Sequence, residues 1–158
     1  MSTGQNRLVD VALDQASLAP ASPNAEHERR IALFDLKESN AFVVVGVDAG
    51  PYALTLAMAE GRLAFDVAGA DGERVCLHQV PLAGLRKIVK DYTLICESYH
   101  NAIRNATPSQ IEAIDMGRRA LHNEGAAMLA ERLAEHADLD HNTARRLFTL
   151  LCVLHMRG

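Results

Sequence analysis

Two stripes of side chains, one on each side of Thr107 and Pro108, constrain this chain more than any other feature. Selected side chains recur at alternating intervals of four and three residues over 85–103, and again over 111–129. That spacing is typical of two helices that each present one stripe. Thr107, Pro108 and Gln110 supply a capping residue, a first-position proline and a capping box for the second helix. The sequence therefore predicts an antiparallel helical hairpin whose stripes meet.

The stripes are apolar at both ends of this hairpin and polar in its middle. The polar residues are Tyr92, Cys96 and Tyr99 on the first helix, and Asp115, Arg118 and His122 on the second. Counting outward from the turn places Tyr92 opposite His122 and Tyr99 opposite Asp115. Ionised groups in an apolar seam are costly unless they are paired, and Asp115 and Arg118 have the helical spacing to pair.

Two interpretations of this polar seam stay open. In the first, a cleft between the two long helices exposes a ligand site for a small anion, or for proton transfer. The candidate ligand-binding residues are Asp115, Arg118, His122, Tyr92 and Tyr99. In the second, the same residues form a satisfied polar network that fixes the register of the helices.

The first half of the chain alternates like β-strands. Large apolar residues occupy every second position over 52–58 and again over 63–67, and Glu60 and Gly61 between them permit a tight turn. A two-residue loop pairs Leu56 with Phe65. Val9, Val11 and Leu13 alternate with Asp10, Ala12 and Asp14, which predicts a half-buried strand over 9–14. Residues 41–47 also read as a strand, and Ser22 with Pro23 starts a helix that runs to about residue 39.

A second hairpin turn is predicted at Asp71-Gly72, with two possible registers for the strand that follows. One buries Cys76 and His78, and the other buries Val75 and Leu77. A slip of one residue decides between them. The larger apolar side chains favour the register that buries Val75 and Leu77.

A last helix is predicted over 143–156, with Asp140 as its cap after a short acidic loop. Its apolar residues from Leu147 to Leu154 cover nearly the whole circumference. Such a helix is either central to the core or half covered by a second subunit. This feature favours a self-associating homo-oligomer, with a further protein partner as another use of the same surface.

These elements define an α+β fold in one domain over 1–158, with a strand-rich layer in 1–80 and a helical layer in 81–158. We expect a mostly antiparallel sheet of about four or five strands with one N-terminal helix, followed by three C-terminal helices. The 158 residues are 49% hydrophobic, enough for a real core.

Composition and motifs exclude several classes of function. The net charge of −4 and the scarcity of aromatic residues disfavour nucleic-acid binding. No uncharged stretch approaches the roughly 20 residues of a membrane span. Three scattered cysteines and the absence of a leader-like N-terminus indicate reduced thiols and a cytoplasmic protein.

Known catalytic and cofactor motifs are also missing. The chain has no phosphate-binding glycine loop, dinucleotide fingerprint or nucleophile elbow. Glu97 and His100 have the spacing of a di-metal ligand pair, but the other ligands are absent and the pair turns toward the outer helix face. The Arg104–Gln110 junction resembles an anion-binding helix start, although a plain helix cap explains it. The sequence predicts no metal and no cofactor, and leaves open whether the protein is an enzyme.

Several long strings are similar to one bacterial family. They are Ile88–Tyr99, Ala106–Arg119, Leu121–Gly125, Ala144–Leu150, and the shorter Glu26–Arg29 and Gly50–Tyr52. Together they resemble the uncharacterised alphaproteobacterial protein family UPF0262 over nearly the whole chain. The resemblance implies a bacterial cytoplasmic protein and brings no activity, cofactor or site residue with it. Of the two function hypotheses, a non-enzymatic interaction or regulatory protein stands ahead of a small-ligand binder or small enzyme.

Overall fold

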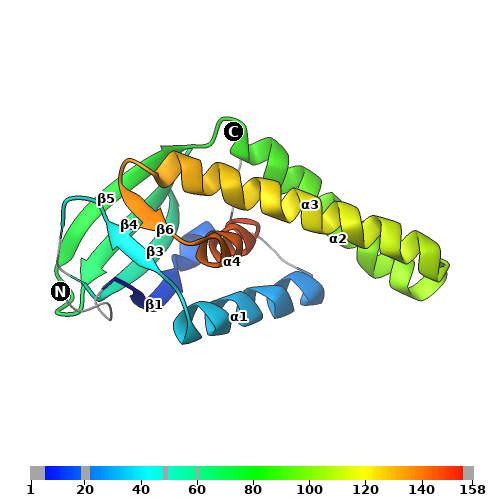
Figure 1. The fold of residues 1–158 in the computed structure, drawn as a ribbon, viewed down its shortest axis with the longest axis horizontal. Coiled ribbons are helices and arrows are strands. Elements are labelled where there is room, and N and C mark those ends of the chain that lie inside the picture. The colour runs from blue at the N-terminus through cyan, green and yellow to red at the C-terminus, as the bar shows by residue number, and fades with distance from the viewer. Residues whose placement is uncertain (1–5, 19–21, 48–49, 60, 155–158) are drawn as a thin grey trace.

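A four-stranded mixed sheet forms one side of the molecule (Figure 1). The computed structural model describes residues 6–18, 22–47, 50–59 and 61–154. The sheet order is β1-β3-β4-β5, with β1 (Leu8–Leu13), β3 (Tyr52–Ala59), β4 (Arg62–Gly69) and β5 (Arg74–Pro81). Only the β1–β3 pairing is parallel among these strands. The predicted α+β class and mostly antiparallel sheet are confirmed.

The β3–β4 hairpin has the predicted register. Leu56 pairs with Phe65, Leu54 with Val67 and Met58 with Leu63. Gly61 has a φ of +74°, a conformation that a tight turn needs and that glycine adopts without strain. Glu60, the other predicted turn residue, lies outside the described residues. The large side chains of both strands therefore share one face.

The register preferred for the next strand is wrong. His78 pairs with Phe65 and Cys76 with Val67, so these two residues lie on the core-facing side, while Leu77 is 43% exposed. The register shifts between Val67 and Ala68, and this irregularity near the turn decides which face is buried. The His78 ring is covered because it stacks on the ring of His136, with 4.0 Å between centroids.

Two other strand predictions need correction. The register of β1 shifts between Leu8 and Asp10, so Leu8 and Val11 are buried and Val9 is 38% exposed. The strand expected over 41–47 is only β2 (Phe42–Val44), and it does not join the sheet. It pairs antiparallel with β6 (Ala137–Leu139), where the sequence indicated an acidic loop.

The four predicted helices are all present. They are α1 (Pro23–Glu38), α2 (Leu85–Asn105), α3 (Pro108–Leu133) and α4 (His141–Leu151). Ser22 caps α1, and Thr107 and Gln110 form the expected capping box of α3. Asp140 caps α4, which ends earlier than predicted. Helices α2 and α3 lie side by side as a hairpin that extends beyond the rest of the molecule (Figure 1).

Helix α4 is central to the core of this chain. It lies between α1 and α3 (Figure 1), and Leu147, Phe148 and Leu151 are completely buried. Gly125 of α3 permits the close approach, because a Cβ atom there would collide with the Phe148 ring. The apolar circumference of α4 is therefore covered within the chain, and a second subunit is not needed to explain it.

Hydrogen bonds tie the end of α1 to α4. The backbone N–H of Ala41 donates to Thr143 Oγ1 at 3.0 Å, and Arg146 Nη1 donates to the carbonyl oxygen of Ser39 at 3.1 Å. Asn40 binds the backbone of Leu8 from the same segment. These contacts fix the spacing of α1 and α4. None of the helices in the described residues is long and apolar enough to cross a membrane.

Candidate functional site

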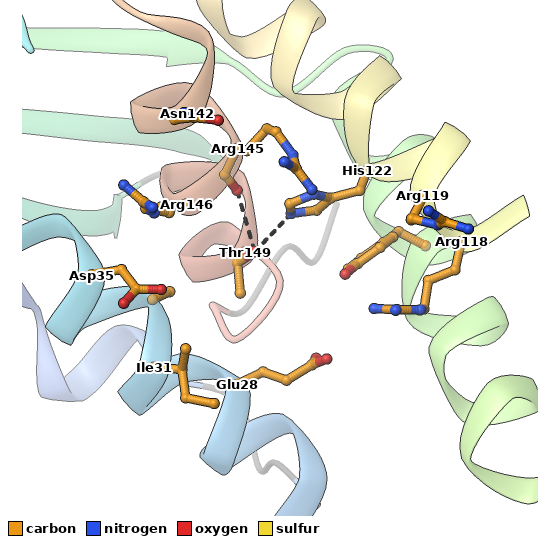
Figure 2. A pocket seen from close by; sticks show the side chains of 12 residues that line it. Glu28, Ile31, Asp35, Arg118, Arg119, His122, Asn142, Arg145, Arg146 and Thr149 are labelled. Carbon is orange, nitrogen blue, oxygen red and sulfur yellow. Dashed lines mark hydrogen bonds between the residues drawn. The ribbon is translucent and has the colours of Figure 1, made fainter. Parts of the chain in front are cut away.

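A pocket that includes residues of the polar seam lies beside this seam rather than between the two long helices. Its volume is about 400 Å³, and α1, α3 and α4 form its walls, with Tyr92 of α2 contributing as well (Figure 2). The predicted residues Arg118 and His122 line it together with Tyr92. The sequence expectation of a cleft between α2 and α3 thus placed the opening on the wrong side of α3.

His122 and two residues of α4 form a closed hydrogen-bond network in this pocket. Arg145 Nε donates to His122 Nδ1 at 3.2 Å, so Nδ1 is an acceptor and the ring proton belongs on Nε2. The Nε2–H then donates to Thr149 Oγ1 at 2.8 Å, and that hydroxyl donates to the Arg145 carbonyl oxygen at 3.2 Å. The network fixes both the tautomer of His122 and the orientation of Arg145.

The His122 ring is neutral in the physiological range. Burial, with the neighbouring positive charges of Arg145 and Arg118, lowers the pKa of His122 to about 4. The ring also packs against Tyr92, with 5.1 Å between centroids, and against Phe148. A neutral imidazole with both nitrogens engaged is suited to holding Arg145 in place and is poorly placed to exchange a proton with a substrate.

Asp115 and Tyr99 hold Arg118 from the other side. Asp115 Oδ1 accepts from Arg118 Nη2 at 2.6 Å, and Asp115 Oδ2 lies 3.1 Å from Arg119 Nε. The guanidinium carbon of Arg118 lies 4.6 Å from the centroid of the Tyr99 ring. The hydrogen bond from Arg118 lowers the pKa of the Asp115 carboxyl. Neither Asp115 nor Tyr99 lines the pocket. Both residues act by holding the Arg118 side chain in position.

Tyr92 faces His122, as the seam predicted. Its side chain is 5% exposed and also packs edge-on against Phe148, with 5.6 Å between centroids. Burial raises the pKa of the Tyr92 hydroxyl, so the hydroxyl stays protonated at any physiological pH. Tyr92 therefore contributes an uncharged wall.

Sequence reasoning missed the arginines of α4. Arg145 and Arg146 both line the pocket, and neither forms a salt bridge within the part of the chain that the structure describes. A guanidinium has five N–H donors, and the contacts above use few of them. Two adjacent arginines directly before the apolar run that begins at Leu147 were a signal that could have identified this wall.

The acidic wall on α1 was also missed. Glu28 and Asp35 line the pocket, and no salt bridge among the described residues includes either of them. Glu28 points toward the α3 side, whereas Asp35 lies on the side of Arg146 (Figure 2). Their spacing of seven residues places both on one helix face, but nothing in the sequence indicates that this face packs near α4.

The remaining candidates are dispersed. Glu97 and His100 line a smaller cavity of about 150 Å³ next to α1, together with Cys96 and Cys152. Within the described ranges, no group of three or more His, Cys, Asp or Glu residues converges as a metal site would. The Arg104–Gln110 junction forms the helix cap described above.

The fold and the pocket together define an α+β protein with an arginine-rich pocket that three helices enclose. The chain belongs to UPF0262, an uncharacterised protein family whose model matches residues 5–157. This confirms the resemblance seen in the sequence.

Relatives from several alphaproteobacteria match over almost their full length. The UPF0262 protein of Methylobacterium radiotolerans is 57% identical over 98% of this chain and 96% of its own. That of Allorhizobium ampelinum is 52% identical over the whole of both chains, and that of Brucella anthropi is 56% identical over 96% and 95%. No solved structure matches this chain.

Proposed function

We propose that this protein binds a small anion in the pocket between α1, α3 and α4, without a chemical step. The observation that carries the proposal is the pair of arginines on α4. Arg145 and Arg146 line the pocket and have no carboxylate within salt-bridge distance among the described residues. Half-buried guanidinium groups without a counter-ion favour an anion that supplies one.

The support around these arginines is typical of a binding site. His122 and Thr149 hold Arg145, while Asp115 and Tyr99 hold Arg118. Fixed guanidinium groups lose less conformational entropy when a ligand binds. Each charge-assisted hydrogen bond to the anion contributes about 1.5–3 kcal/mol. Binding rather than proton transfer fits the engaged, neutral His122 ring.

The test is isothermal titration calorimetry with two probes, inorganic phosphate and valerate, on the full chain. We expect saturable binding of at least one probe, and a loss of about tenfold or more in affinity in Arg145→Gln. Arg62→Gln is the matched control, because Arg62 is exposed on β4 and does not line the pocket. Absence of binding, or equal affinity in Arg145→Gln and wild type, contradicts the proposal.

Self-association stays a prediction with a weaker basis. Its motive was the apolar circumference of α4, and Leu147, Phe148 and Leu151 are covered by the chain itself. Sedimentation velocity across micromolar concentrations checks it. A homo-oligomer would have to use a surface other than α4.

A further inference from the structure

Glu28 lies where three cavities meet, and the anion-binding proposal assigns it no role. It lines the arginine-rich pocket of about 400 Å³ and also two adjoining cavities of about 150 and 50 Å³. Its side chain is partly buried, and it forms no salt bridge with any described residue. Figure 2 shows its carboxylate extending across the opening, away from α1. A carboxylate in this position favours a cationic partner.

The smallest cavity is mostly apolar. Ala25, Cys96, Cys152 and Val153 contribute to its lining, and it shares Glu28 with the arginine-rich pocket. Burial raises the pKa of the Cys96 thiol, and the nearby Glu28 carboxylate adds to that rise. The thiol is therefore neutral and behaves as a small hydrophobic group. The small apolar cavity therefore adjoins the arginine-rich pocket at Glu28.

Positive and negative groups thus stand on different walls without pairing. Arg145 and Arg146 lie on α4, and Glu28 lies on α1, with no salt bridge across the gap between them. A ligand with two negative groups would satisfy the arginines but place charge next to Glu28. A ligand with one negative and one positive group complements both walls.

We propose that the ligand is a zwitterion of the α-amino acid class, an inference that rests on the anion-binding function proposed above. Its carboxylate binds Arg145, its ammonium group binds Glu28, and a small aliphatic side chain enters the cavity beside Cys96 and Val153. Arg–carboxylate pairing is bidentate and directional, so it orients the ammonium toward the opposite wall.

Three matched probes test each part of this assignment. L-norvaline carries both charges, valerate lacks the ammonium group, and butylamine lacks the carboxylate. In calorimetry with the full chain, we expect norvaline to bind about tenfold tighter than valerate, and butylamine not to bind measurably.

Variants separate the two walls. In Glu28→Gln, norvaline affinity falls to that of valerate, while valerate binds at least as well as in the wild type because a negative charge is gone. In Arg145→Gln, we expect the binding of both norvaline and valerate to be lost. Glu26→Gln is the matched control, because Glu26 pairs with Arg29 at 2.6 Å and does not line these cavities. Far-UV circular dichroism verifies that each variant is folded.

The outcomes distinguish this inference from the function beneath it. If valerate or phosphate binds through Arg145 but norvaline has no advantage, the zwitterion assignment is overturned and anion binding stands. The same holds if the advantage of norvaline survives in Glu28→Gln. If no carboxylate or phosphate binds at all, both proposals fall.

Discussion

The two halves of the α2–α3 hairpin share one sequence pattern and differ in their surroundings. Near the sheet, Leu85 and Leu129 are completely buried under the other elements. At the far end, which extends beyond α1 and α4 (Figure 1), Ile103 is 52% exposed and Met116 is 60% exposed. The spacing of three and four residues therefore predicts which faces meet. How deeply a residue of the hairpin is buried depends on which other elements pack against it. The candidate site lies between the buried half and the exposed half of the hairpin.

We expect the largest difference in stability between the two halves of the hairpin when a glycine in each half is replaced by alanine. Gly125→Ala places a Cβ atom against the buried Phe148 ring, and we expect the free energy of unfolding to fall by about 4 kcal/mol, above the common overpacking range. Gly117→Ala in the far half meets only the end of the Ile95 side chain, at 2.9 Å. There the gain in helix propensity of about 1 kcal/mol offsets the contact. Urea denaturation of both variants measures the contrast, and equal losses would contradict it.

Large-to-small substitutions give the next effect. Leu129→Ala removes a completely buried side chain in the near half, and we expect a loss of about 3 kcal/mol. Ile103→Ala in the far half changes a side chain that is already half exposed, and we expect a change within about 0.5 kcal/mol. Urea denaturation of both variants, analysed with one common m-value, measures the two changes in the free energy of unfolding. A large loss in Ile103→Ala would reveal a packing surface at the far end.

His122, between the two halves, predicts a dependence of stability on pH. Its pKa is about 4 in the folded protein and 6.5 as an ordinary value, so the unfolded chain binds more protons between these pH values. Stability is therefore complete above about pH 6.5 and falls as the pH drops toward 4, by roughly 2 kcal/mol after allowance for partial exposure.

Comparison with His122→Gln isolates this contribution. Burial and His136 also lower the pKa of His78, which gives a slope in the same direction in both proteins. Denaturation curves from pH 7 to pH 4 should be flatter for the variant. Parallel curves would show that His122 does not carry the effect.

The smallest effect is expected in the far half, at the ion pair. Asp115→Asn removes the negative charge that pairs with both Arg118 and Arg119 and replaces one of its two acceptor oxygens with an NH2 donor. We expect a slight fall in Tm at low salt that becomes smaller at high salt, because salt screens ion pairs that are partly exposed to solvent. The contribution of Asp115 to the proposed site is measured by comparing the ligand affinity of Asp115→Asn with that of the wild type, because Asp115 no longer holds Arg118 by an ion pair in this variant.

Features encoded locally could be predicted from the sequence. The β3–β4 register follows from periodicity on each side of one turn and is confirmed, and in the α2–α3 hairpin Tyr92 contacts His122 as the spacing predicts. At the far end of that hairpin the stripe does not predict burial, because Ile103 is 52% exposed and its neighbour Ala102 is buried. The register of β5 could not be predicted, because an irregularity at Val67 shifts it and a distant residue, His136, covers His78. The pairing of β2 with β6 joins three-residue segments too short to carry a pattern.

The candidate site divides in the same way. The sequence places Tyr92 opposite His122 and Arg118 near Asp115, because these residues lie on one hairpin. The arginines of α4 and the carboxylates of α1 come to this point only through packing of separate elements. Periodicity within a helix does not encode which other helix it meets.

The contacts that close the pocket join residues far apart in the chain. The Ala41–Thr143 hydrogen bond spans 102 positions, and the Ser39–Arg146 hydrogen bond spans 107. During synthesis, α1 leaves the ribosome long before α4 exists, so a nascent chain holds the acidic wall without the basic one. The proposed ligand site therefore forms only after α4 has been synthesised, and a ligand that contacts both walls would selectively stabilise molecules that have finished folding.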